Sequence, residues 1–138
     1  MSDLYFSINR ENGNVILESQ LPADKNWISY ALFISITTPI KITVGKLGEF
    51  IFPGGDYIYY GSARKGLRAR VNRHLRSEKK LHWHIDYLLA AAAVTITRIR
   101  ISTISECQLV AAGGGAVVVK GFGASDCIQA CGSHLRRI

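Results

Sequence analysis

The sequence predicts a single domain of the α+β class. Segments rich in β-branched and aromatic residues, which favour strands, stand beside segments whose apolar residues recur with helical period. The chain has 138 residues, the size of one compact domain, and its 48% hydrophobic and 20% charged content is that of an ordinary globular protein. We find no internal repeat and no linker, so we assign residues 1–138 to one domain.

The first strand of the core is predicted at residues 27–36, WISYALFISI. This run is rich in β-branched and aromatic residues and is long enough for a buried strand. Before it, residues 1–26 form an N-terminal extension or hairpin, because Asn12-Gly13 is a strong two-residue turn signal between two apolar stretches. We therefore place the core of the domain at residues 27–135.

Two further strand regions come after it. Residues 40–52 contain two strand segments around a glycine-containing turn, which predicts an inserted β-hairpin. The next strand is predicted at residues 56–61. Because side chains alternate between the faces of a strand, Tyr57 and Tyr59 should share one face, with Tyr60 on the other.

The pattern then changes to helical period. Between residues 65 and 76 the apolar residues Leu67, Val71 and Leu75 recur every four positions, which gives a helix one buried stripe. A second helix is predicted over residues 82–91, HWHIDYLLAA.

A strand and a capped helix come next. VTITRIRIS, residues 94–102, alternates along its length and should place Ile96 and Arg98 on the same face. Ser105 is a suitable N-cap for a short helix over residues 106–112, because its hydroxyl can accept from a backbone N–H of the first turn.

The C-terminal part is less regular. The run Gly113–Gly115 should end the preceding helix, and AVVVKGF, residues 116–122, predicts a last strand. Residues 123–138 show neither period, so no element is assigned to them.

The positive charge is concentrated on one segment. The formal net charge is +7, and residues 64–80 alone contain eight basic residues and one acidic residue, so this segment carries the whole excess. A concentrated basic patch indicates a polyanionic partner such as nucleic acid. The residues that could bind the phosphate backbone of a nucleic acid are Arg64, Lys65, Arg68, Arg73, Arg76, Lys79 and Lys80.

The sequence argues against a membrane or secreted protein. The longest apolar run, from Tyr87 to Ile96, is far shorter than the roughly 20 residues of a membrane helix. The N-terminus lacks the basic start and apolar stretch of a signal peptide. We therefore expect a cytoplasmic protein whose three cysteines are reduced.

Two groups of residues could suggest a metal site. Cys127, Cys131 and His134, with Cys107 as a fourth ligand, have the residue types of a structural zinc site but not a common zinc spacing. Buried structural thiols are the better interpretation of these cysteines. His82 and Asp86 are helical neighbours and could also suggest a metal, although His82 fits a phosphate-contacting role better.

One group of residues resembles the signature of the GIY-YIG nuclease superfamily. The match consists of Tyr59-Tyr60-Gly61-Ser62-Ala63 at the end of a strand, then Arg70 and His74 on the next helix. The first half of the signature falls at Ile28-Ser29-Tyr30, where only the tyrosine is retained. The chain is most similar to the uncharacterised Uri-type (DUF123-like) branch, through segments spanning about residues 27–135.

The resemblance implies a fold and a site. The fold would be a small central antiparallel sheet flanked by helices, with the 40–52 hairpin inserted between the half-motifs. The site would use one divalent ion, Mg²⁺ or Mn²⁺, held by Glu106. Tyr30 or Tyr59 would be the base, and we favour Tyr30, with Tyr59 orienting it.

The resemblance also assigns the remaining roles. Arg70 can bind phosphate oxygens bidentately, and His74, on the same helix face, would hydrogen-bond the base or the scissile phosphate. His82 is placed near the active surface, and Ser125 and Asp126 would line the cleft.

The sequence is consistent with three functions. The leading one is a metal-dependent endonuclease that hydrolyses phosphodiester bonds in DNA, on branched or linear substrates. The alternative is a nucleic-acid-binding module that has lost catalysis and uses the basic helix of residues 64–80. A third is a protein whose basic helix docks an acidic protein partner.

Overall fold

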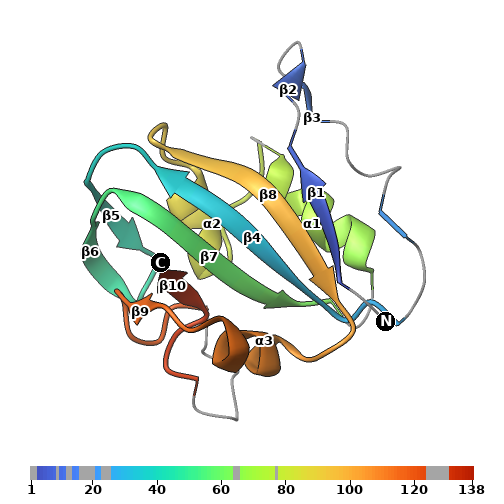
Figure 1. Cartoon of the computed structure of the whole chain (residues 1–138). Helices are drawn as coiled ribbons and strands as arrows, with labels where there is room; N and C mark the ends of the chain where they lie inside the picture. The colour runs from blue at the N-terminus through green and yellow to red at the C-terminus, as the bar shows by residue number, and fades with distance from the viewer. Residues whose placement is uncertain are drawn as a thin grey trace.

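The fold is α+β, as predicted, and its centre is an antiparallel sheet (Figure 1). The computed structural model describes residues 3–8, 10–11, 14–15, 21–22, 26–63, 66–76, 78–123 and 131–138. The main sheet has six strands, every neighbouring pair antiparallel. Its order is β1 (Leu4–Ser7), β8 (Val94–Ser102), β4 (Ser29–Ile36), β7 (Gly55–Ser62), β10 (Leu135–Arg137) and β9 (Ala116–Val117).

Helices cover both faces of this sheet. The main core contains α1 (Leu67–Leu75) and α2 (His84–Leu89), which lie behind the sheet in Figure 1. A smaller core on the opposite face contains α3 (Glu106–Gly113). As predicted, Leu67, Val71 and Leu75 form the buried stripe of α1. Within the described part of the chain, none of the helices combines the length and apolarity required to cross a membrane.

The tyrosines of β7 divide between the two cores as the alternation predicted. Tyr57 and Tyr59 pack in the main core, which also contains the buried residues of α1 and α2. Tyr60 packs in the smaller core against Leu109 and Val110 of α3. Because successive side chains of a strand point to opposite faces, this one segment anchors both layers of helices.

The prediction for the faces of β8 was wrong in its second half. Val94 and Ile96 face the main core, but Ile99 and Ile101 join them there. A β-bulge explains the change: Arg98 pairs with Phe33 while Ile96 pairs with the next residue of β4, so Thr97 is an extra residue. An extra residue shifts the alternation by one, which moves the arginines of β8 to the other face.

The inserted hairpin is present as a separate two-stranded sheet. It consists of β5 (Ile40–Val44) and β6 (Gly48–Phe52), as predicted for residues 40–52. Val44 and Phe52 are fully buried, so the hairpin packs its inner face on the main core.

The N-terminal segment forms both a hairpin and an edge strand. Strands β2 (Arg10–Glu11) and β3 (Asn14–Val15) pair, while the predicted turn Asn12-Gly13 between them lies outside the described residues. β1 pairs with β8 and extends the main sheet.

The C-terminal elements differ from the prediction. The expected last strand at 116–122 is reduced to the two residues of β9, because Val119 and Phe122 turn into the main core. The tail supplies β10, which lies between β7 and β9. Its three residues are too few to show an alternation, which is why the sequence pattern did not reveal it.

The second helix, α2, is shorter than the predicted 82–91.

A buried carboxylate holds α1 against α2. Asp86 is fully buried, and both its oxygens accept hydrogen bonds of 2.8 Å from the guanidinium of Arg73. The backbone N–H groups of His82 and Trp83 donate to it at 2.9 and 2.8 Å. Burial alone would raise the pKa of Asp86, but these hydrogen bonds outweigh it and lower the pKa. Arg73 also lies over the ring of Trp83, 4.1 Å from its centroid.

We expect Asp86→Asn to destabilise the fold strongly. Removing one partner of a buried ion pair leaves the other charge uncompensated, which costs about 3 kcal/mol. The free energy of unfolding from urea titrations measures the loss. Glu49→Gln is the matched control, because its pair with Lys41 is exposed (side chains 55% and 64%) and should contribute less than about 1 kcal/mol. Equal effects of the two substitutions would contradict the role of Asp86.

Candidate active site

A cavity of about 420 Å³ is lined by four of the five residues to which the sequence assigned a catalytic or metal-binding role. Its lining includes Tyr30 of β4, Tyr59 of β7, Arg70 of α1 and Glu106 of α3. His82, which precedes α2, also lines it. These residues are up to 76 positions apart in the chain, and the fold brings them to one hollow.

His74 lies behind Tyr30 and acts on the cavity through it. The Oη atom of Tyr30 is 2.6 Å from Nε2 of His74, which is a short hydrogen bond between two buried side chains. The sequence left open whether His74 would contact the base or the phosphate. Its buried position, with 2% of its surface exposed, favours the contact with the tyrosine.

Gly61 allows the two tyrosines to face the same cavity. In the register of β4 and β7, Tyr30 stands opposite Gly61, and Tyr59 stands opposite the residue two positions after Tyr30. A Cβ atom at Gly61 would overlap the phenol ring of Tyr30. Gly61 is therefore required at this position, because the ring of Tyr30 on the neighbouring strand occupies the space of a side chain.

Burial keeps the tyrosines and the histidine neutral. Burial, followed by the charge of the neighbouring Tyr59 phenol, raises the pKa of Tyr30 well above its usual value. Burial and then Glu106 raise the pKa of Tyr59. Burial and the nearby Lys79 lower the pKa of His74 to about 3. The charge of Arg70 acts to lower the pKa of both tyrosines, but burial outweighs it.

Arg70 presents its charge to the cavity from an exposed position. Its guanidinium carbon lies 5.3 Å from the centroid of the Trp83 ring, which also lines the cavity. The guanidinium of Arg73, which forms the buried ion pair, also lies over this ring. Trp83 therefore connects the Asp86 network to the guanidinium that faces the cavity.

Glu106 is the only carboxylate among the described residues that line the cavity. It is the first residue of α3, and Ser105 caps this helix, as predicted, by accepting a hydrogen bond from the backbone N–H of Gln108. The Glu106 side chain is 27% exposed, and one oxygen lies 3.6 Å from Nδ1 of His134. A partly exposed carboxylate oxygen is a suitable ligand for a hard cation such as Mg²⁺, which binds proteins through one or two carboxylates.

Two of the predicted nucleic-acid-binding residues have structural roles instead. Arg73 directs its guanidinium to the buried Asp86, which corrects its assignment to a nucleic-acid surface and removes Asp86 as a metal ligand. Lys79 donates from Nζ to the carbonyl oxygens of Arg73 and His74, at 3.1 and 2.8 Å, and so satisfies the C-terminal end of α1. Burial lowers the pKa of Lys79 to about 8.

The other described basic residues of this set are exposed. Arg68 is exposed but also donates to the carbonyl of Leu21. Arg76, Lys80 and His82 are exposed. The other predicted members, Arg64 and Lys65, lie outside the described residues, as do Ser125 and Asp126.

Two further histidines line the cavity, although the sequence did not predict either of them at this site. His84 lines it, and its Nδ1 accepts a hydrogen bond of 2.8 Å from the backbone N–H of Gly123. His134 lines it from the segment before β10. For His84 the signal was present in the pattern His82-Trp83-His84, because all three of these residues line the cavity.

Comparison with known proteins gives one match. The model of the family described as "Domain of unknown function DUF123" matches residues 29–138, which include every described element from β4 onward. No curated protein and no solved structure matches the chain.

We expect Gly61→Ala to displace Tyr30. The added methyl group would overlap the phenol, and overpacking of this kind costs about 1–3 kcal/mol. Urea unfolding gives the stability change, and the NMR signals of the His74 ring report the loss of its hydrogen bond to Tyr30. In the control Gly54→Ala, the nearest atoms stand 3.4–3.8 Å from the new Cβ, so the change should stay below about 1 kcal/mol. An unperturbed His74 signal in Gly61→Ala would refute the packing argument.

His74 should make the protein less stable as the pH falls. Its folded pKa of about 3 lies below the unfolded value of about 6.5, so between these values the unfolded chain binds a proton that the folded chain does not. The His74 contribution then falls by about 1.4 kcal/mol for each pH unit below about 6.5. Urea unfolding of wild type and His74→Gln between neutral pH and about pH 4 measures the slope.

The variant should show a shallower slope than wild type by about one proton. His82→Gln removes an exposed histidine and serves as the control for the loss of an imidazole. If His74→Gln keeps the wild-type slope, the buried neutral histidine does not account for the pH dependence.

Proposed function

Because the chain belongs to the DUF123 family, a domain of unknown function, we propose its activity from its own site: it is a divalent-metal-dependent endonuclease that hydrolyses phosphodiester bonds in DNA. The observation that carries the proposal is the shared cavity of Tyr30, Tyr59, Arg70 and Glu106. It supports the finer resemblance to GIY-YIG nucleases, because residues matched only by sequence motif also meet in space.

Arg70 would bind the scissile phosphate. Its guanidinium is held beside Trp83 and offers paired N–H groups, which match two oxygens of one phosphate better than a lysine does. Exposed cations on and after α1, such as Arg76 and Lys80, would contact the flanking backbone. Contacts of this kind position a strand without reading its sequence.

Tyr30 would accept the proton of the attacking water. The structure gives Nδ1 of His74 no partner among the described residues, and a buried unpaired N–H is rarer than a buried unpaired acceptor. We therefore place the imidazole proton on Nε2, where it donates to the Tyr30 oxygen. A hydrogen bond donated to this oxygen stabilises its ionised form and directs its remaining lone pair toward the cavity.

Tyr59 would orient the base and exclude solvent behind it. Its ring stands edge-on to His74, with centroids 6.0 Å apart, and edge-on to Phe122 at 6.3 Å. This packing fixes the imidazole that holds Tyr30. Gly123 supports the arrangement, because a Cβ there would lie 2.9 Å from the Tyr59 ring.

Glu106 would hold Mg²⁺ or Mn²⁺ in this cavity. When bound, the ion supplies positive charge, which polarises the phosphate and offsets the burial that raises the tyrosine pKa. The fit rests on the carboxylate chemistry and partial exposure of Glu106. Nδ1 of His134 lies 3.6 Å from one oxygen of this carboxylate.

A nucleic-acid-binding module without catalysis is the second candidate. The raised pKa values of both tyrosines favour it, because neither phenol ionises readily in the chain alone. It would bind DNA through the same exposed cations, and its affinity would fall steeply with salt. It would leave the strands intact.

We expect Glu106→Ala and Arg70→Ala each to lower the cleavage rate by about 100-fold or more, because each removes charge stabilisation at the reacting phosphate. Purified protein is incubated with branched, nicked, single-stranded and duplex DNA, with matched RNA strands, in Mg²⁺ or Mn²⁺, and the products are resolved on denaturing gels. Glu49→Ala, which removes an exposed carboxylate of the inserted hairpin, should cleave like wild type.

Two results would reject the nuclease proposal. The first is equal cleavage by wild type and Glu106→Ala on every substrate, which would point to a contaminating activity. The second is salt-sensitive binding with intact strands after long incubation, which would establish the binding module instead.

A further inference from the structure

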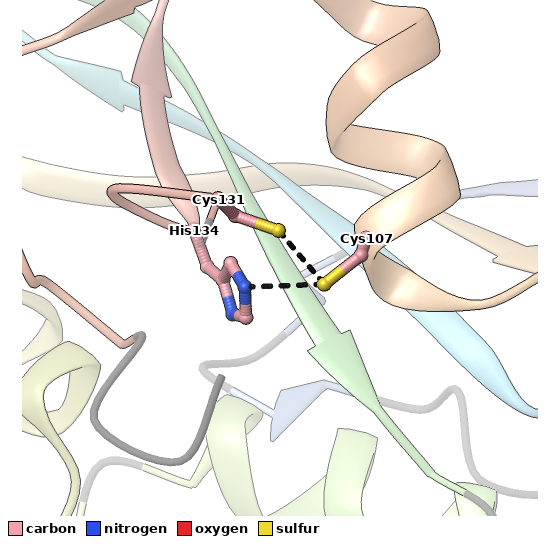
Figure 2. A group of neighbouring side chains, drawn as sticks. All are labelled: Cys107, Cys131 and His134. Atoms are coloured by element: carbon pink, nitrogen blue, oxygen red, sulfur yellow. Dashed lines mark hydrogen bonds between the residues drawn. The ribbon is translucent and has the colours of Figure 1, made fainter. Parts of the chain in front are cut away.

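Three side chains with soft donor atoms meet beside the candidate active site. Cys107 comes from the first turn of α3, whereas Cys131 and His134 come from the segment that leads into β10 (Figure 2). The sulfur atoms of the two cysteines are 2.8 Å apart, and the Cys107 sulfur lies 3.9 Å from Nε2 of His134. One ligand atom from each residue lies within 4.8 Å of the others.

The histidine is held in an orientation suitable for metal binding. Its ring is buried, with 2% of its surface exposed, and Nε2 faces the cysteines. On the other side of the ring, Nδ1 faces the carboxylate of Glu106 at 3.6 Å. A histidine that binds a metal through one nitrogen usually donates its second N–H to a carboxylate or carbonyl, which fixes the tautomer and strengthens the ligand.

The backbone around this histidine is also fixed. The N–H of His134 donates to the carbonyl of Phe122, and its own carbonyl accepts from the N–H of Tyr60, both at 2.9 Å. Arg136 donates from its side chain to the carbonyl of Cys131. The donors therefore stand on a segment already tied to the sheet, as a preformed site requires.

Zinc suits this donor set better than the hard cation expected at Glu106. Thiolates and an imidazole select zinc over magnesium, and three protein ligands leave a fourth tetrahedral position for water. Ligands at zinc-bond distances stand about 3.8 Å apart, so the cysteine sulfurs would separate by about 1 Å on binding. The half-buried Cys107 and Cys131 can make this change by rotating their side chains.

We propose that Cys107, Cys131 and His134 bind one Zn²⁺ ion, which joins the first turn of α3 to the segment before β10. Both thiols lose their protons when the metal binds, so binding releases up to two protons and weakens at low pH. The ion fixes the helix turn that carries Glu106, and it is a different ion, with different ligands, from the cation proposed at Glu106. Zinc binding at these residues does not depend on the nuclease activity.

The test measures metal binding by the intact chain. The protein is purified under reducing conditions without a metal-affinity tag, stripped with a chelator, and titrated with Zn²⁺ and, separately, Co²⁺. We expect one Zn²⁺ per chain by elemental analysis. The Co²⁺ form should show a thiolate-to-cobalt charge-transfer band and the visible bands of a tetrahedral ion. A wild-type protein with neither property overturns the proposal without any variant.

Variants then identify the ligands. Cys107→Ser and Cys131→Ser should each remove charge-transfer intensity. Each should also weaken Zn²⁺ binding by more than the roughly 10- to 100-fold that follows the loss of a residue that only hydrogen-bonds a metal ligand. His82→Asn is the control, since it removes an exposed cavity histidine outside the cluster and should retain full binding. Circular dichroism confirms folding, and Cys127, which lies outside the described residues, is unchanged throughout.

Two results would reject these ligands. One is wild-type Zn²⁺ affinity in both cysteine variants. The other is a Cys107–Cys131 disulfide in the air-exposed protein, detected by mass spectrometry, combined with no Zn²⁺ binding after reduction.

Discussion

The structure depends on one buried negative charge, that of Asp86. A carboxylate without exposure must be surrounded by donors, and Asp86 obtains them from α1 and from the backbone that leads into α2. This requirement turns Arg73 inward, sets Trp83 against it, and brings the loop with His82 beside α1. The basic character of α1 is thereby divided: part of it is neutralised inside the molecule, and Arg70 remains at the cavity.

A second constraint is the crossing of Tyr30 over Gly61. The glycine provides the space, and His74 provides a short hydrogen bond to the phenol oxygen. The arrangement places two phenols at the cavity but also removes them from water, so the chain alone opposes their ionisation. Chemistry at these tyrosines therefore needs positive charge from the side of the cavity where the Glu106 carboxylate lies. The cation that we propose at this carboxylate would supply that charge.

Regular patterns in the sequence predicted a large part of the fold. The alternation in β7 assigned Tyr57 and Tyr59 to one face, and the four-residue spacing identified the buried stripe of α1. The predictions failed where a single irregular residue, or a partner distant in the sequence, determines which way a side chain points. Nothing in the sequence marks Thr97 as the extra residue of a bulge, and the charge of Arg73 looks solvent-facing until Asp86 is placed beside it. The sequence could group Cys107 with Cys131 and His134 by residue type, but spacing along the chain does not show that the fold brings the three together.

The sheet order has a consequence for the kinetics of folding. β1 pairs with β8, where Leu4 stands opposite Ile101, and β7 pairs with β10, where Tyr59 stands opposite Leu135. Contacts between segments so distant along the chain close large loops, so folding is slower than in helical proteins of similar size. The apolar β4 cannot pair until its neighbours β7 and β8 are present, and β8 is synthesised much later. During that interval its unpaired backbone is vulnerable to association with other nascent chains.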